Sequence, residues 1–174
     1  LLYRWGDPET YGAGTAADQK LAGQHDARWI EPGDPGEGHI LIFNNGTNRG
    51  YSSVDEIVTP VAVDGSYTMS GGVWGPADPT WTYSATPTSD LYADHISGAQ
   101  RLNNGNTLIC DGPKGRFFEV TEDGEIVWDY INPVTEVGAL TQGEVPDAGG
   151  PGPGGGGPGN QVFRAWRYSP DHPA

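Results

Sequence analysis

The feature that most constrains this chain is a run of tight-turn signals spaced only a few residues apart. Between Arg101 and Pro133 the turns NNG, GPKG and TEDG separate short runs rich in β-branched and aromatic residues. Gly and Asn accept the left-handed backbone that tight hairpins require, so each signal predicts a reversal of the chain. With the preceding run HISGAQRL, the pattern predicts a meander of antiparallel strands at 95–102, 106–111, 116–120 and 125–131.

This four-strand unit repeats a pattern found earlier in the chain. GHILIFNNG resembles GNTLICDGP as the second strand of a unit, and PTWTYSATP resembles EIVWDYINP as the last. LLYRWGDP at the start fits the same last-strand pattern, and VFRAWRY near the end begins another strand. Tandem four-stranded meanders with a tryptophan near the end of each are typical of β-propellers.

We therefore predict an all-β fold, a β-propeller fragment of about two complete four-stranded antiparallel blades plus flanking single strands. The alternative is a β-sandwich of about ten strands. Closed propellers have at least about four blades, so 1–174 is expected to be a partial propeller from a longer protein. Its predicted parts are 1–8 (last strand of a preceding blade), 24–86 (a blade with a long loop near 64–78), 95–133 (a blade), 135–160 (a Gly/Pro-rich surface loop) and 161–171 (first strand of the next blade).

The charge balance excludes two classes of partner. The net charge is −14 and the isoelectric point is near 4.3. Such an acidic surface repels nucleic-acid phosphates and anionic lipid headgroups, so neither nucleic acid nor a membrane surface is expected as a partner. No apolar run approaches the roughly 20 residues of a membrane-spanning helix. The single cysteine, Cys110, lies in an apolar run and is expected to be a buried small hydrophobe.

The strand runs also carry a resemblance to a known family. The stretches QHDARWIEPGDPGEGHILIFNNG, SSVDEIVTPV, GPADPTWTYSA and SGAQRLNNGNTLICDGPKGRFFEVTEDGEIVWDYINP resemble the arylsulfotransferase family of bacterial β-propellers. The likeness covers nearly the whole chain except the Gly/Pro tract. It implies transfer of a sulfuryl group from an aryl sulfate to a phenol through a histidine, without a nucleotide donor, in a periplasmic or secreted protein.

Two histidines are the candidate catalytic residues. Sulfuryl transfer needs a nucleophile and an acid or base, and imidazole serves as either near neutral pH. His25 and His95 precede the second strands of their units at matching places, so both are expected on first strands facing the central channel. Ser97 stands where the family has an asparagine that contacts sulfate, and it is the first candidate for substrate binding. Arg164 is the second, because strand alternation puts it opposite in facing to Arg167 and leaves at most one of them in the channel.

The sequence thus predicts an arylsulfotransferase-like propeller acting on a small aryl sulfate and a phenol through channel histidines. The alternative is a binding or scaffold propeller that lacks the chemistry, favoured by three departures from the family: Ser97, the absence of an arginine near Asp111 and the absence of the family's nucleophilic histidine. No cofactor and no metal are expected, and TEDGE is too short for an EF-hand loop. The donor, the acceptor and the oligomeric state are left open.

Overall fold

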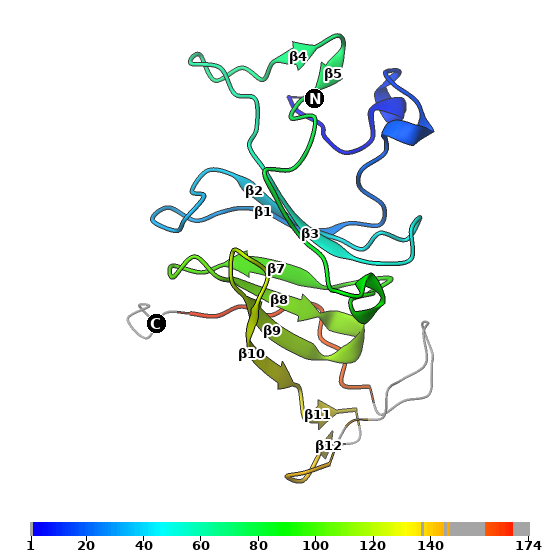
Figure 1. Cartoon of the computed structure of the whole chain (residues 1–174), viewed down its shortest axis with the longest axis vertical. Coiled ribbons are helices and arrows are strands. Elements are labelled where there is room, and N and C mark those ends of the chain that lie inside the picture. Colours follow the sequence, from blue (N-terminus) through cyan, green and yellow to red (C-terminus); the bar gives the residue numbers. More distant parts are fainter. Residues whose placement is uncertain (1, 137, 145, 147–158, 169–174) are drawn as a thin grey trace.

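The chain is all-β in a computed structural model that describes residues 2–136, 138–144, 146 and 159–168. Strands and short 3-10 helices are the regular elements of this described part, which contains no α-helix. It also contains no helix that is long and apolar enough to cross a membrane. Two four-stranded antiparallel sheets stack face to face (Figure 1).

The first sheet has the strand order β1-β2-β3-β6, each strand antiparallel to its neighbour. A β-bulge interrupts β1 between His25 and Arg28, where Asp26 takes a left-handed backbone with φ of 53°. A small hairpin of β4 and β5 lies in the long connection from β3 to β6, inside the predicted long loop. The strand bounds are β1 (His25–Trp29), β2 (Ile40–Asn44), β3 (Ser53–Ile57), β4 (Met69–Ser70), β5 (Val73–Trp74) and β6 (Trp81–Tyr83).

The second sheet is an uninterrupted meander with the spatial order β10-β9-β8-β7. Gly105 and Gly124 hold positive φ angles of 87° and 86° in the turns that join β7 to β8 and β9 to β10. These are the left-handed positions that the turn signals predicted. The strand bounds are β7 (Gly98–Arg101), β8 (Thr107–Asp111), β9 (Arg116–Val120) and β10 (Ile126–Ile131).

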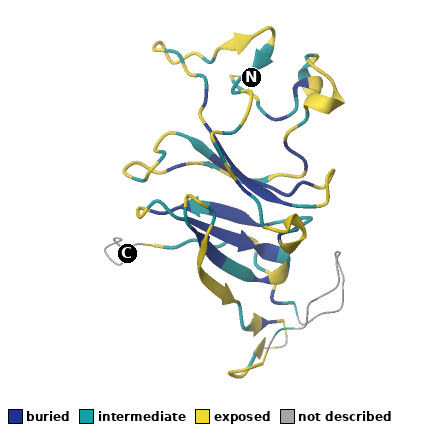
Figure 2. Cartoon of the chain, viewed as in Figure 1, coloured by how far each residue is buried: buried dark blue, intermediate teal, exposed yellow. Residues whose placement is uncertain are grey.

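The main hydrophobic core lies between the two sheets, where buried residues form a dark band in Figure 2. Alternate residues of each strand point into this layer, as the period of a β-strand requires. The first sheet contributes Leu41, Phe43, Val54 and Tyr83, and the second contributes Ala99, Ile109, Phe118 and Val120.

The opposite face of each sheet is covered by a segment without strand structure. On the first sheet, Ile42 and Ile57 pack with Leu21, Tyr3 and Trp5 from the N-terminal segment. On the second sheet, the extended segment 159–168 runs beside β7, and the Val162 carbonyl accepts a long contact from the thiol of Cys110. One inner strand of each sheet, β2 in the first and β8 in the second, is therefore buried on both faces.

The predictions of single strands at 1–8 and 161–171 are wrong for the residues that the structure describes. Residues 2–7 form no strand, because Tyr3 and Trp5 donate side-chain hydrogen bonds to the Gly75 and Pro76 carbonyls instead of pairing their backbone. The described part of 161–171, residues 161–168, is extended but is not assigned as a strand.

The predicted loop 135–160 lies mostly outside the described residues. Its described beginning is not irregular, since β11 (Val134–Thr135) and β12 (Gly138–Ala139) form a small antiparallel hairpin.

Candidate functional site

His25 is the first residue of β1, as predicted, and its ring is held in one orientation. The Nδ1 atom lies 2.9 Å from the Gly23 carbonyl and 2.8 Å from the side-chain oxygen of Asn45. Both partners are acceptors, so Nδ1 carries the hydrogen in the neutral ring. The lone pair then lies on Nε2, which has no hydrogen-bond partner among the described residues. A histidine that attacks an electrophile or accepts a proton needs such a nitrogen.

The orientation of the Asn45 amide is itself determined by its other contacts. Its Nδ2 donates to the carbonyls of Ala93 and Ile96 at 2.7 and 3.0 Å, so its oxygen must face His25. Asn45 is fully buried at the end of β2. One amide therefore connects the start of β1 to the residues that lead into β7, and it places His25 beside the loop that contains His95.

Ser97 lies directly before β7 and is fully buried. Its hydroxyl accepts a hydrogen bond from the Gly112 N–H at 3.0 Å, and its own N–H donates to the Phe163 carbonyl at 2.9 Å. Ile96 and Ser97 both take positive φ angles, 45° and 86°. The prediction that Ser97 binds substrate does not fit this placement, because its hydroxyl joins β7 to β8 and is closed off from a ligand.

His95 lies in the loop before β7 and not on the strand, so the expected equivalence of the two histidines is wrong. His25 pairs with Phe43, the fourth residue of β2, while Cys110, the fourth residue of β8, pairs with Gly98. His95 is three residues earlier than that position.

The Nδ1 atom of His95 is hydrogen-bonded to the Asp94 carboxylate, and its side chain is 35% exposed. A carboxylate in this position orients the ring.

Arg164 meets the first sheet at Asp26. Its Nη1 lies 3.5 Å from the carboxylate of Asp26, which also pairs with Arg28. Arg28 in turn lies over the Trp166 ring, with its guanidinium carbon 3.9 Å from the ring centroid. The Arg167 side chain instead pairs with Glu119 on β9. Arg164 and Arg167 thus point to different strands, in agreement with the prediction that they face opposite ways.

These side chains border a hollow of about 380 Å³, which we call the arginine hollow. Two guanidinium groups face one carboxylate there, so the wall carries a net positive charge within a chain of net charge −14. The His25 ring is not part of this lining, but it precedes Asp26 in β1 and contacts the ring of Phe163, the residue before Arg164, edge to face at 6.2 Å between centroids. The arginine hollow is lined by Asp26, Ala27, Arg28, Arg164, Trp166 and Tyr168.

Arg28 and Asn45 are the site residues that the sequence analysis did not single out. Strand alternation counted from His25 places Arg28 on the opposite face, but the bulge at Asp26 shifts this alternation. Asn45 belongs to the NNG that ends the run GHILIFNNG, where its residue type indicates a turn, and only the fold brings it to the imidazole.

The remaining candidates offer no second site. Burial raises the pKa of the Cys110 thiol to about 12, with a further contribution from Asp111, so the thiol stays neutral and unreactive. Burial also raises the pKa of Asp111, against the opposing effect of Lys114. Within the residues that the structure describes, no group of three or more His, Cys, Asp and Glu side chains is arranged to hold a metal ion.

Comparisons with protein-family models, with curated proteins and with solved structures gave no match. The resemblance to arylsulfotransferases is therefore still a prediction from the sequence.

Proposed function

We propose that the two sheets are neighbouring blades of a β-propeller. We also propose that His25, at the end of the central channel that these blades would line, transfers sulfuryl groups between phenols. The arrangement of the sheets supports the first part. Their contacts concentrate where β7 approaches β1 and β2, as expected for blades that converge on a central axis. The outer strand β10 is exposed along its whole length, like a blade face that a further blade would cover.

The observation that carries the second part is the tautomer of His25 beside a positively charged hollow. Asn45 holds the hydrogen on Nδ1 and leaves the lone pair on Nε2. Arg28 and Arg164 supply donors and positive charge for the oxygens of a sulfate ester. The negative charge of the rest of the surface makes this local positive charge the natural place for an anion.

In the proposed reaction, Nε2 of His25 attacks the sulfur of the ester while the bond from sulfur to the phenolic oxygen breaks. The departing phenolate takes the bonding electron pair and a proton from the protonated His95–Asp94 pair. The oxygen of a second phenol then attacks the sulfur, its proton passes to the His95–Asp94 pair, and the sulfur–nitrogen bond breaks to restore the lone pair of His25. Periplasmic or secreted localisation belongs to the same proposal and follows from the family resemblance.

The test is release of 4-nitrophenol from 4-nitrophenyl sulfate, with and without phenol as acceptor. We expect release that depends on acceptor, lost by at least about 100-fold in His25→Ala and reduced about tenfold or more in Arg164→Met. His39→Gln is the matched control, because His39 pairs with Glu56 away from the arginine hollow, and it should keep the activity.

A folded chain that releases no phenol would contradict the proposal. It would leave the second candidate, a non-catalytic propeller that binds an anion in the arginine hollow. One observation favours that candidate: the carboxylate of Asp26 occupies the space between the two arginines. Binding of 4-nitrophenyl sulfate without turnover, weakened in Arg164→Met, would distinguish it.

A further inference from the structure

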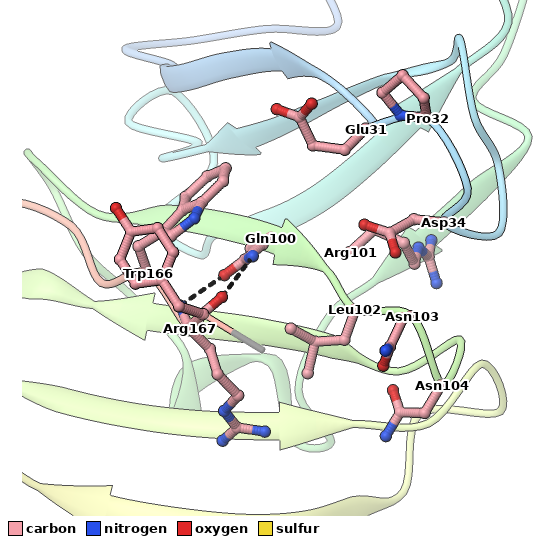
Figure 3. A pocket seen from close by; sticks show the side chains of 11 residues that line it. Glu31, Pro32, Asp34, Gln100, Arg101, Leu102, Asn103, Asn104, Trp166 and Arg167 are labelled. Atoms are coloured by element: carbon pink, nitrogen blue, oxygen red, sulfur yellow. Dashed lines mark hydrogen bonds between the residues drawn. The ribbon is translucent and has the colours of Figure 1, made fainter. Parts of the chain in front are cut away.

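A second and larger hollow lies at the other end of β1 and β7. It has a volume of about 750 Å³ and lies between the segment after β1, the hairpin after β7 and residues 166–168 (Figure 3). His25 and Ser97 stand at the starts of the two strands, whereas Glu31 and Leu102 follow their ends. We call this the hairpin hollow. Its volume is in the usual range of small-molecule sites, roughly 300–1,000 Å³.

One wall of the hairpin hollow is held rigidly. The Gln100 side chain donates to the Arg167 carbonyl at 3.0 Å and accepts from the Arg167 N–H at 2.8 Å, the two dashed contacts in Figure 3. The guanidinium of Arg28 covers part of the neighbouring Trp166 ring from the side of the arginine hollow. Arg28 thus covers one side of the indole, and Gln100 fixes the backbone of the next residue, Arg167. An aromatic ring held in this way suits a stacking surface for a ligand.

The charges around the hairpin hollow disfavour an anion. The two arginines of its lining are neutralised within the protein, Arg101 by Glu56 and Arg167 by Glu119. The carboxylates of Glu31 and Asp34, by contrast, have no cationic partner in the described part of the chain, and Figure 3 shows them on the upper and right-hand walls. Burial and the charge of Glu31 raise the pKa of Asp34, as expected for carboxylates without a counter-ion.

The hydrogen-bonding groups disfavour a simple cation as well. Asn103 lies on the hairpin with an amide that offers two N–H donors and an acceptor, and no described residue binds it. The guanidinium of Arg167 adds further N–H groups to the wall. A cationic ligand would satisfy the carboxylates but would face these donors. A ligand that both donates and accepts, carries no charge and has an apolar face satisfies all of them.

We propose that the hairpin hollow binds a neutral sugar. Sugar hydroxyls donate to the carboxylates of Glu31 and Asp34 and accept from Asn103, while a pyranose face packs on Trp166. The two hollows share the wall residues Trp166 and Tyr168. The proposal still does not depend on sulfuryl transfer, because Glu31, Asp34 and Asn103 do not border the arginine hollow.

The experiment is a titration of the intact chain with maltose, cellobiose, lactose and mannobiose, followed by saturation-transfer NMR and tryptophan fluorescence. We expect at least one disaccharide to bind in the millimolar range or more tightly. Trp166→Ala and Asn103→Ala should each weaken that binding about tenfold, the effect of losing one aromatic contact or one hydrogen bond. Trp74→Ala is the matched control, because this tryptophan borders a different hollow on the β4–β5 hairpin and should leave binding unchanged.

Two results would overturn the proposal: no saturation transfer to any of the disaccharides from a chain with native circular dichroism, or binding that survives Trp166→Ala and Asn103→Ala unchanged. Tetramethylammonium is included as a cationic probe, and binding of it in place of the disaccharides would also contradict the assignment. 4-Nitrophenyl sulfate should not compete with the sugar, which separates this outcome from that of the sulfuryl-transfer assay.

Discussion

Glu56 on β3 and Arg101 on β7 form a buried ion pair that joins the two sheets. Their side chains are 8% and 6% exposed, and the Glu56 carboxylate also accepts a hydrogen bond from His39 at 2.6 Å. Arg101 donates further to the Gly105 carbonyl and lies against the Trp81 ring. This ion pair thus links the two sheets by charge, in addition to the apolar side chains packed between them.

Removing one partner of this pair should destabilise the chain strongly, because it leaves the other charge buried. We expect Glu56→Gln to lower the free energy of unfolding by about 3 kcal/mol or more, measured by urea denaturation. Asp78→Asn is the control, since the Lys20–Asp78 pair is exposed and should cost less than about 1 kcal/mol. Equal losses in the two variants would show that the buried pair contributes no more than a surface pair.

Gly98 should not tolerate a side chain, although its backbone is ordinary. A Cβ atom there would lie 2.2 Å from Oδ2 of the buried Asp26 carboxylate. We expect Gly98→Ala to lower the free energy of unfolding by about 1–3 kcal/mol, as overpacking does. The double variant with Asp26→Ala should lose less than the sum of the two single variants, because the clash is absent. Simple additivity in the double-mutant cycle would argue against this contact.

The Cys110 thiol should resist modification until the chain unfolds. Its pKa is raised to about 12, so the thiolate is scarce at pH 8, and the side chain is buried. We expect iodoacetamide to label it in urea but only very slowly under native conditions.

The raised pKa of the Cys110 thiol also predicts how the stability of the chain depends on pH. In the unfolded chain the thiol ionises near its ordinary pKa of about 8.5, while the folded chain still holds the proton. The unfolded state is then favoured increasingly as the pH rises from about 9 toward 12, and this contribution to stability should be absent in Cys110→Ala. An identical pH dependence of the two proteins in urea melts would contradict the assignment.

The tautomer of His25 can be observed directly. With Asn45 in place, ¹⁵N NMR at pH 8 should show a protonated Nδ1 and an unprotonated Nε2 in this ring. Asn45→Ala removes one of the two acceptors at Nδ1 and leaves the Gly23 carbonyl, so it should raise the share of the other tautomer without abolishing this one, at the cost of the two hydrogen bonds to Ala93 and Ile96. His95 provides the internal comparison, since its Nδ1 partner, Asp94, is unchanged.

Three strands of the second sheet were predicted to within one residue, because their information is local, whereas β7 begins at Gly98 and the expected strand began at 95. The expected strand at 116–120 is β9 itself, and those at 106–111 and 125–131 differ from β8 and β10 by one residue at the start. Turn glycines at close spacing leave little freedom for the strands between them. The segment before residue 8 failed for the opposite reason: its Leu, Tyr and Trp pattern suits a strand, but the pairing partner is not determined by nearby sequence.

The candidate site was predicted only in part. His25 and Arg164 lie where a site can form. Ser97 was chosen because it stands where the family resemblance places an asparagine, and its burial depends on the approach of Gly112 and Phe163. Arg28 was missed because a bulge changes which face a residue occupies, and nothing in HDARW signals one. The hairpin hollow combines residues about 70 positions apart, which only the stacking of the sheets brings together.

The outer strand β10 is the free edge of its sheet in the described part of the chain, and five of its six residues are apolar or aromatic. Figure 2 shows it exposed along its whole length. The remaining residue, Asp129, is held by Arg116 through two oxygens. Edge-to-edge addition of another chain would have to bury this carboxylate with its arginine, and that cost works against fibrillar self-association through β10.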